Sequence, residues 1–177
     1  MNVPRLSKRA LGRQILARWL RLAFPTYLVV LISVALFPYL NNGPMFEFFY
    51  DHYVKQQVGT YWWTYILFIS NLVPFNNSQG LYWLFFTANE LQFCIFVLAP
   101  AVYMYQRRYR RRLVLNFLGI IIALSVLYIF LMSLINDFSI LLTVDILTMF
   151  DELYRYPFGP VGYYSLGIVI AIFYFEY

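Results

Sequence analysis

A carboxylate inside a long apolar segment is the residue of this sequence that most invites a chemical role. Glu90 follows Asn89 and lies two residues before Gln92 within the apolar segment 81–105. A charged side chain in mid-membrane costs about 2.5–3.5 kcal/mol, so it commonly marks a functional site. Asn89 and Gln92 share a helix face, whereas Glu90 is predicted to point at a neighbouring helix. Two interpretations are open: a polar intramembrane site, or an interhelical hydrogen bond that locks a bundle.

Histidine and cysteine add little chemistry to this carboxylate. His52 is the single histidine and lies beside Asp51, with Glu47 nearby, where we expect a solvated side chain. Cys94 is the single cysteine, which excludes an intrachain disulfide, and its apolar surroundings favour a packed hydrophobe. A zinc site needs several His or Cys ligands, and the eight glycines form no nucleotide-binding loop. We therefore predict no catalytic residues, no metal site and no cofactor.

The composition is that of a membrane protein. Of the 177 residues, 62% are hydrophobic and 12% are charged, whereas soluble domains have roughly 45–50% and about 25%. A soluble fold of this length has too much surface for its volume to hide so many apolar side chains. In lipid, outward-facing side chains are apolar as well, so the composition is compatible with membrane-spanning helices.

The apolar segments predict an all-α membrane protein with about four transmembrane helices. A spanning helix needs about 20 apolar residues, and four segments approach or exceed that length. The predicted spans are residues 22–40, 81–105, 113–134 and 159–177.

Three further segments complete this prediction. Residues 61–75 are too few to span and contain Asn71 and Pro74, so they are predicted to be re-entrant or interfacial. Residues 41–60 are predicted to form a loop. Residues 1–21 hold six basic residues and no acid, which predicts a basic amphipathic helix at the membrane surface. The organisation is thus an N-terminal arm (1–21) followed by one transmembrane domain (22–177), whose first span has Pro25 near its start, where a helix tolerates proline.

Basic residues are gathered in two clusters that flank apolar segments. The first includes Arg18 and Arg21, and the second consists of Arg107, Arg108, Arg110, Arg111 and Arg112. Such clusters set the orientation of a membrane protein or contact anionic lipid headgroups. We therefore expect membrane lipids, including anionic ones, as partners, and no nucleic acid.

Four spans would place both basic clusters on one side of the membrane. The acidic connections would lie on the other side, and they contain Glu47, Asp51, Asp137, Asp145, Asp151 and Glu152. If residues 61–75 also crossed, the two basic clusters would face opposite sides, which the positive-inside rule disfavours. The acid-free N-terminus also resembles a mitochondrial transit peptide, with a positive-inside anchor as the alternative interpretation.

Several short strings together resemble the acyltransferase-three family of membrane O-acyltransferases, in particular the branch named for nose resistance to fluoxetine. They are Arg18, Arg21, Leu22, Pro25 and Tyr27; Pro38, Tyr39, Leu40, Gly43, Pro44 and Met45; Trp62, Trp63 and Thr64, with Asn71 beyond; Ala88, Asn89, Glu90, Leu91, Gln92 and Phe93; and Tyr156, Pro157, Pro160, Tyr163 and Gly167. Their order and gaps are similar to the family's, and the resemblance covers nearly all of this chain but a middle portion of the family's length.

The departures from the family pattern bear on function. In the family, the spans before the first string carry a histidine thought to be the catalytic base; it has no counterpart here, and His52 lies elsewhere. Phe85–Phe86 stand where the family has Trp-Tyr. The two cysteines that bracket the family's Trp-Trp segment are absent, which fits a loop outside an oxidising lumen.

These observations lead to three functional hypotheses. The first is a non-catalytic, acyltransferase-like remnant that acts as a structural or accessory subunit of a larger membrane complex, with other integral membrane subunits as partners. The second is an O-acyltransferase that moves an acyl group to a lipid or sugar hydroxyl, with Glu90 and Arg21 lining a site that a partner chain completes. The third is a transporter or channel fragment. The expected location is the mitochondrial inner membrane, with the endoplasmic reticulum or plasma membrane as alternatives.

Overall fold

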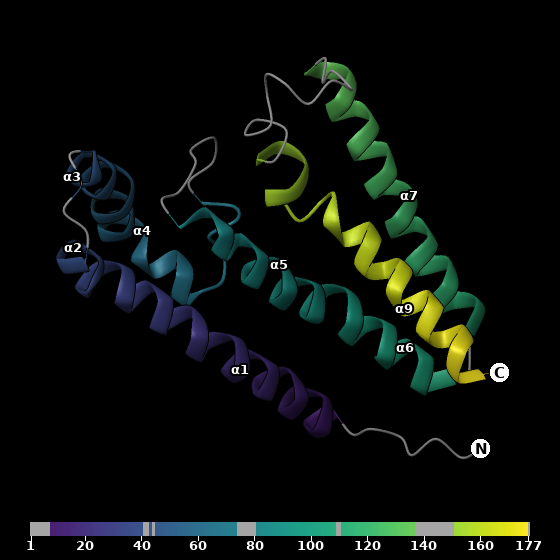
Figure 1. Cartoon of the computed structure of the whole chain (residues 1–177). Helices are drawn as coiled ribbons and strands as arrows, with labels where there is room; N and C mark the ends of the chain where they lie inside the picture. The colour runs from purple at the N-terminus through teal and green to yellow at the C-terminus, as the bar shows by residue number, and fades with distance from the viewer. Residues whose placement is uncertain are drawn as a thin grey trace. The chain divides into compact units, whose positions relative to one another are not determined.

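Every element of the described structure is helical. The computed structural model describes residues 8–40, 43, 45–73, 81–108, 111–136 and 151–176, and these contain no β-strand. In chain order the helices are α1 (Lys8–Ala35), α2 (Phe37–Leu40), α3 (Phe46–Phe49), α4 (Gln56–Ile66), α5 (Phe85–Phe93), α6 (Ala99–Arg108), α7 (Arg111–Ile135) and α9 (Pro160–Glu176) (Figure 1). Shorter π-helical segments cover Tyr50–Lys55, Cys94–Leu98 and Asp151–Arg155, and a 3-10 turn covers Tyr82–Leu84.

Four helical stretches are long and apolar enough to cross a membrane. They are Arg9–Ala35, Phe85–Tyr105, Arg111–Ile135 and Leu153–Tyr174. This confirms the predicted all-α membrane fold with four spans, and the chain is a multi-pass integral membrane protein. Helix α4, which covers the start of the predicted re-entrant segment, has 11 residues and is too short to cross.

The N-terminal arm and the first predicted span form one continuous helix. Helix α1 runs from Lys8 to Ala35 without a break at residue 21, and residues 1–7 lie outside the described part. Pro25 therefore lies inside the helix and not near its start. The neighbouring Thr26 donates its side-chain hydroxyl to the carbonyl of Leu22 at 2.8 Å. Hydroxyl-to-carbonyl bonds of this kind help transmembrane helices to accommodate proline.

The segment between the first span and α4 is helical, contrary to the predicted loop at residues 41–60. After Met45 the chain forms α3, the π-helical segment Tyr50–Lys55 and then α4. Packing explains the difference, because Val54 and Val58 join a buried cluster. In addition, the Tyr50 hydroxyl donates to the carbonyl of Val34 at 2.9 Å. These contacts outweigh the polar residues on which the loop prediction rested.

Helices α5 and α6 form one continuous helical stretch with a π-helical segment between them. The wider turns of Cys94–Leu98 come just before Pro100, the second residue of α6. Proline has no N–H to donate and its ring clashes with the carbonyl four residues earlier, here that of Phe96. A π-helical turn relieves such a conflict by shifting the hydrogen-bond register. The stretch Phe85–Tyr105 thus stays helical across a proline.

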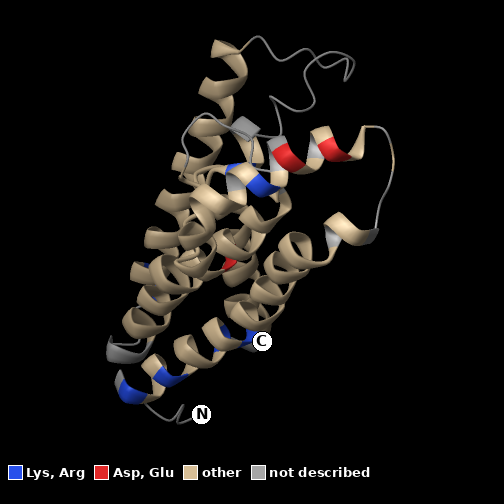
Figure 2. Cartoon of the chain, turned by 90° about the vertical axis from the view of Figure 1, so that its left-hand side faces the viewer, with Lys and Arg blue, Asp and Glu red and all other residues tan. Residues whose placement is uncertain are grey.

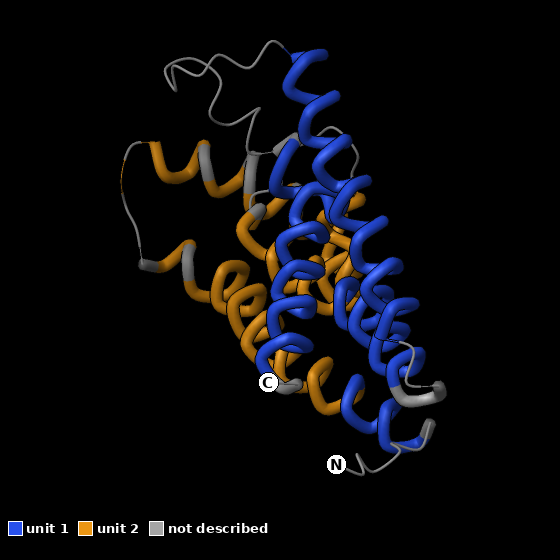
Figure 3. Tube along the Cα trace, turned by 90° about the vertical axis from the view of Figure 1, so that its right-hand side faces the viewer, with its two compact units in different colours: residues 1–15, 92–177 blue, residues 16–91 orange. Residues whose placement is uncertain are grey.

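The chain divides into two compact units, coloured separately in Figure 3. Residues 16–91 form one unit, called here the N-terminal unit. Two buried clusters hold it together. One joins Ala23 of α1, Phe68 after α4, and Ala88 and Leu91 of α5. The other consists of Val58, Tyr65, Leu81 and Leu84, with Val30 and Val54 packed against it. These clusters fasten α1, α4 and α5 around the segment that follows α4.

The second unit, called here the C-terminal unit, comprises residues 1–15 and 92–177. Its core joins Val97 and Ala101 to Val114 and Leu118 of α7, with side chains of α9 packed against them. Helices α7 and α9 lie side by side and antiparallel (Figure 1), because Arg111 meets Phe173 whereas Ser125 meets Gly159. Residues 137–150, including Asp137 and Asp145 of the predicted acidic connection, lie outside the described residues.

The outer surfaces of these helices are strongly apolar. Phe24 of α1 is 74% exposed and Ile120 of α7 is 61% exposed. Along the long helices, Figure 2 shows charged residues confined to a few turns, with the remaining length uncharged. Monomeric soluble proteins rarely expose continuous apolar surface of this extent. Lipid is the environment that such surfaces require.

Candidate intramembrane polar site

The central feature of the candidate site is an ion pair between two membrane-crossing helices. Arg18 of α1 places Nη2 2.8 Å from Oε1 of Glu90 on α5. Each residue lies inside a stretch that can span the membrane. Their side chains keep 28% and 25% of their exposure. Opposite charges at this distance offset each other, so the pair as a whole carries no net charge.

A buried amide pair adjoins this ion pair, because one of its members, Asn89, directly precedes Glu90. The side-chain nitrogen of Asn71 donates to the side-chain oxygen of Asn89 at 2.6 Å. Both residues are buried, Asn71 completely. Buried polar groups are costly unless they are hydrogen-bonded, and this bond pairs an N–H group of Asn71 with the side-chain oxygen of Asn89. Since Asn89 and Glu90 are consecutive on α5, one turn of that helix is tied to two different segments.

The chain turns sharply after α4, and this turn brings Asn71 to Asn89. The Ile69 amide donates to the Thr64 carbonyl at 2.9 Å and the Phe68 amide to the Tyr65 carbonyl at 3.4 Å. This pair of hydrogen bonds is the Schellman arrangement that ends many helices. Its left-handed position is occupied by Phe68, with φ of 55°, where glycine is usual. A bulky residue in this conformation costs about 1–3 kcal/mol and persists where its surroundings dictate it.

Packing of the Phe68 ring accounts for that conformation. The side chain is buried among Ala23, Ala88 and Leu91, which come from α1 and α5. In the same region the Tyr27 hydroxyl donates to the carbonyl of Ile66 at 3.1 Å. That carbonyl belongs to the last turn of α4, where backbone oxygens lack helical partners. The end of α4 is therefore fixed by apolar and polar contacts from both flanking helices.

The structure distributes the predicted site residues unevenly. Asn89 and Glu90 lie in the N-terminal unit, whereas Gln92 begins the C-terminal unit and is half-buried. Arg18 and not Arg21 is the arginine beside Glu90; Arg21 is exposed one turn further along α1. The small residues Ala23, Thr26 and Ser33 are buried and mark the packed face of α1, which Arg18 borders.

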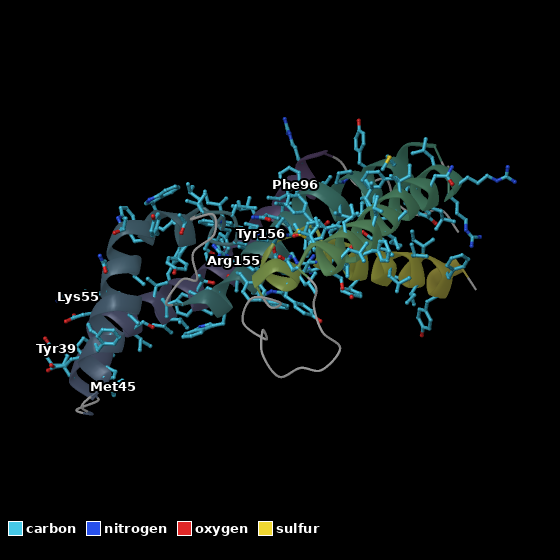
Figure 4. All side chains as sticks on the ribbon, turned by 90° about the horizontal axis from the view of Figure 1, so that it is seen from above. Tyr39, Met45, Lys55, Phe96, Arg155 and Tyr156 are labelled. Carbon is cyan, nitrogen blue, oxygen red and sulfur yellow. The ribbon has the colours of Figure 1, made fainter. Side chains whose placement is uncertain are left out.

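Two further residues of interest were not among those predicted. Asn71 lies in the short segment after α4, and its partner Asn89 is 18 positions away. Arg155 is 2% exposed, and its guanidinium lies 5.7 Å from the ring centroid of the adjacent Tyr156 (Figure 4). In the sequence Arg155 follows the acidic residues Asp151 and Glu152, and this pattern does not predict a buried side chain.

The remaining predicted residues lie at helix ends. Arg107 and Arg108 end α6, and Arg111 and Arg112 begin α7; Arg110 lies outside the described residues. His52 belongs to the π-helical segment Tyr50–Lys55, and its side chain is not described. Among the described residues, no three His, Cys, Asp or Glu side chains gather in a way that would hold a metal ion.

Comparison with known proteins bears on this arrangement of helices. The chain is similar to the nose resistant to fluoxetine protein 6 of Caenorhabditis elegans. The two are 26% identical over 163 residues. The matched region covers 87% of this chain but 19% of the nematode protein, so the chain corresponds to about a fifth of its length. The similarity supports the resemblance to the nose-resistant branch. No family model matches the chain, and no solved structure matches it significantly.

Proposed function

We propose that this chain is a non-catalytic structural module of a larger membrane assembly, in which intramembrane polar residues fasten helices. The observation that carries the proposal is the 2.8 Å contact between Arg18 and Glu90. A general base must present its carboxylate to a proton of the substrate. The carboxylate of Glu90 instead contacts a guanidinium of the neighbouring helix, and holding helices together accounts for that contact.

The amide pair supports the same role. Asn71 and Asn89 are buried and hydrogen-bonded to each other, which is how polar side chains join helices in membranes. Bonds of this type contribute about 0.6 kcal/mol on average and at most about 1.7 kcal/mol. The apolar cluster around Phe68 surrounds the same helices. Polar and apolar contacts thus act together on α1, α4 and α5.

A charge exchange tests the fastening role directly. Glu90→Leu leaves the Arg18 charge without its carboxylate, so we expect less folded, assembled complex in mild detergent. The double variant Arg18→Glu with Glu90→Arg restores the pair and should recover much of the loss. Arg21→Gln, on the exposed side of the same helix, is the matched control and should change little. Unchanged complex yield in Glu90→Leu would remove the support for this role.

The accessory role is tested by what accompanies the purified chain. We expect size-exclusion chromatography in mild detergent, followed by mass spectrometry, to find stoichiometric integral membrane subunits bound to it. Recovery of a single small species that keeps its helical circular dichroism would contradict the accessory role. The mitochondrial inner membrane stays a prediction, with the endoplasmic reticulum and plasma membrane as alternatives, and fractionation of cells that express the tagged chain decides among them.

The second candidate is an O-acyltransferase whose site another segment or chain completes. It is favoured by the partial exposure of Arg18 and Glu90, which leaves the pair accessible. Similarity to a protein of which this chain covers 19% allows such a completion. The test is acyl-CoA turnover by the purified assembly with lipid or sugar acceptors. Turnover that Glu90→Gln abolishes while the assembly stays intact would favour this candidate over the structural one.

A further inference from the structure

Asn116 is a polar residue of α7 whose amide makes no hydrogen bond within the described part of the chain. The other three asparagines of that part are all bonded. Asn71 and Asn89 bond to each other, and the Asn136 side chain donates to a backbone carbonyl four residues before it. Asn116 lies inside Arg111–Ile135, which can span a membrane, and it is exposed. An amide that meets hydrocarbon without a hydrogen bond is unfavourable, so a partner from outside the chain is expected.

The amide points away from the core of its own unit. Val114 and Leu118 are buried in that core, and they lie two positions before and two positions after Asn116. Successive residues of an α-helix are roughly 100° apart, so a residue two positions away lies on nearly the opposite side. Asn116 therefore faces away from the helices that pack against α7, where lipid or another protein can meet it.

A row of exposed residues continues this side of α7, called here the outer face. The residues that follow Asn116 at alternating steps of four and three are Ile120, Ala123, Leu127, Phe130 and Leu134. That spacing is the 3.5-residue repeat along which two helices pack in a left-handed seam. Gly119 lies beside the row, and a Cβ added there would meet nothing within 4 Å. Packing inside the chain therefore does not require a glycine at this position, whereas the close approach of a second helix would use it.

The chemistry of the amide selects a second copy of this chain as the partner. An asparagine side chain has both N–H donors and an accepting oxygen, so two identical amides across a two-fold axis can bond to each other in both directions. Two copies inserted in the same orientation hold Asn116 at the same depth, whereas a different partner would need its own polar group at that depth. The chain already joins two of its segments in this way, because Asn71 donates to Asn89 at 2.6 Å.

We propose that the outer face of α7 is a homodimer interface, in which Asn116 of one copy bonds to Asn116 of the other. The experiment places the full chain in phosphatidylcholine vesicles, with donor and acceptor fluorophores attached through Lys55→Cys in a Cys94→Ser background. Energy transfer should fall with rising lipid-to-protein ratio as a monomer–dimer equilibrium requires. Asn116→Leu should weaken the dimer by roughly 5- to 30-fold, the range that interhelical hydrogen bonds of model peptides give.

Matched variants separate this interface from general association. Asn136→Leu removes another exposed asparagine, whose amide already bonds within the chain, and should leave energy transfer unchanged. Asn116→Gln keeps an amide and should retain more association than Asn116→Leu. Gly119→Leu should weaken the dimer, whereas Gly167→Leu on α9, where an added Cβ also meets nothing within 4 Å, should not. Equal effects of the two asparagine-to-leucine variants, or of the two glycine variants, would overturn the proposal.

Cross-linking identifies the face that meets the second copy. In the Cys94→Ser background, Ala123→Cys should form a disulfide between copies in oxidised vesicles, whereas Leu124→Cys, one position further around the helix, should form far less. Stronger cross-linking through Leu124→Cys would overturn the assigned face. Unchanged energy transfer in Asn116→Leu would mean that water or headgroups satisfy the amide, and a chain that stays monomeric at every density would also overturn the proposal. These vesicles hold no other subunit, so the result does not depend on the accessory role.

Discussion

The two units differ in the contacts that join the segments inside each of them. In the N-terminal unit, polar side chains reach between segments: Arg18 to Glu90, Asn71 to Asn89, and Tyr27 to a backbone carbonyl. In the C-terminal unit, α7 and α9 meet through small residues and apolar side chains. Lipid removes most of the hydrophobic drive for helix association, so close packing and hydrogen bonds remain. Both units have buried apolar clusters, and the N-terminal unit adds several polar contacts between its segments.

Close approach in the C-terminal unit centres on Ser125 and two glycines. The Ser125 hydroxyl donates to the carbonyl of Gly159 at 2.5 Å. A Cβ added at Gly162 would lie 2.4 Å from the Ser125 oxygen and 2.7 Å from its Cβ. No side chain larger than hydrogen fits that position without movement of a helix. The comparison teaches that the N-terminal unit joins its segments partly through charged and amide side chains, whereas the C-terminal unit has no room for added volume at this crossing.

The comparison assumes that both units cross the membrane in the orientation that the basic clusters predict. Labelling of single cysteines tests this orientation with an all-or-none result. Cys94→Ser yields a cysteine-free background, because Cys94 is the single cysteine. We expect Arg13→Cys and Arg112→Cys to react with an impermeant maleimide from the same side of sealed vesicles, and Lys55→Cys from the other side. Reaction of Arg13→Cys and Arg112→Cys from opposite sides would contradict the four-span topology on which both descriptions depend.

The largest effect on stability is expected at the α7–α9 crossing. Gly162→Ala should destabilise the protein by about 1–3 kcal/mol, because overpacking forces helices apart. Gly167→Ala, on the same helix with nothing within 4 Å of the added Cβ, is the control and should be close to neutral. Unfolding in sodium dodecyl sulfate, followed by far-ultraviolet circular dichroism, measures both.

Ser125→Gly combined with Gly162→Ala sharpens the same test. Removing the serine side chain clears the two atoms that the new methyl group would meet, although it also removes the bond to Gly159. We expect the double variant to recover part of the loss. A double variant no more stable than Gly162→Ala would mean that another contact sets the spacing.

A smaller effect is expected from the buried amides of the N-terminal unit. Asn71→Ala and Asn89→Ala each remove the hydrogen bond between these buried amides, so each should destabilise. The double variant should lose less than the sum of the two, with a coupling energy of about 0.6–1.7 kcal/mol. Asn136→Ala is the control, since that exposed side chain contacts the carbonyl four residues before it. Additive losses would show that the two amides act separately.

The sequence predicted the fold better than the contacts within it, for a physical reason. Span number follows from apolar length, which is a local property, and the predicted number of spans agrees with the four long apolar helices. The spacing of Asn89, Glu90 and Gln92 also predicted that Glu90 would face a neighbouring helix, as it does. The choice of Arg18 over Arg21 was missed, because it depends on the rotation of α1 against α5.

Contacts that depend on a turn or on packing were also missed. Asn71 reaches Asn89 because the chain turns at Phe68. Phe68 has a left-handed backbone conformation, and no local sequence pattern predicts that conformation for a phenylalanine. The predicted loop at residues 41–60 is helical since Val54 and Val58 find a buried cluster. Both outcomes are set by partners distant in the sequence.

The smallest effect on stability is expected from the ion pair between Lys55 and Asp51, which lies outside the candidate spans. This pair is a useful contrast to the pair between Arg18 and Glu90. Lys55 and Asp51 lie 3.4 Å apart, one helical turn from each other, with side chains 68% and 61% exposed. An exposed pair of this kind contributes at most about 0.5 kcal/mol and is screened by salt. Lys55→Gln should therefore barely change unfolding, and added salt should remove the change.

Arg18→Gln is the matched experiment in the same unit. It removes one charge from a closer and less exposed pair, inside helices that can span the membrane. Its destabilisation should exceed that of Lys55→Gln and persist in salt, because ions in solution screen partly buried charges less. Equal, salt-sensitive effects of the two variants would mean that water surrounds Arg18 and Glu90 as freely as the exposed pair. The polar contacts of this unit would then lie at the membrane surface and would not fasten helices within lipid.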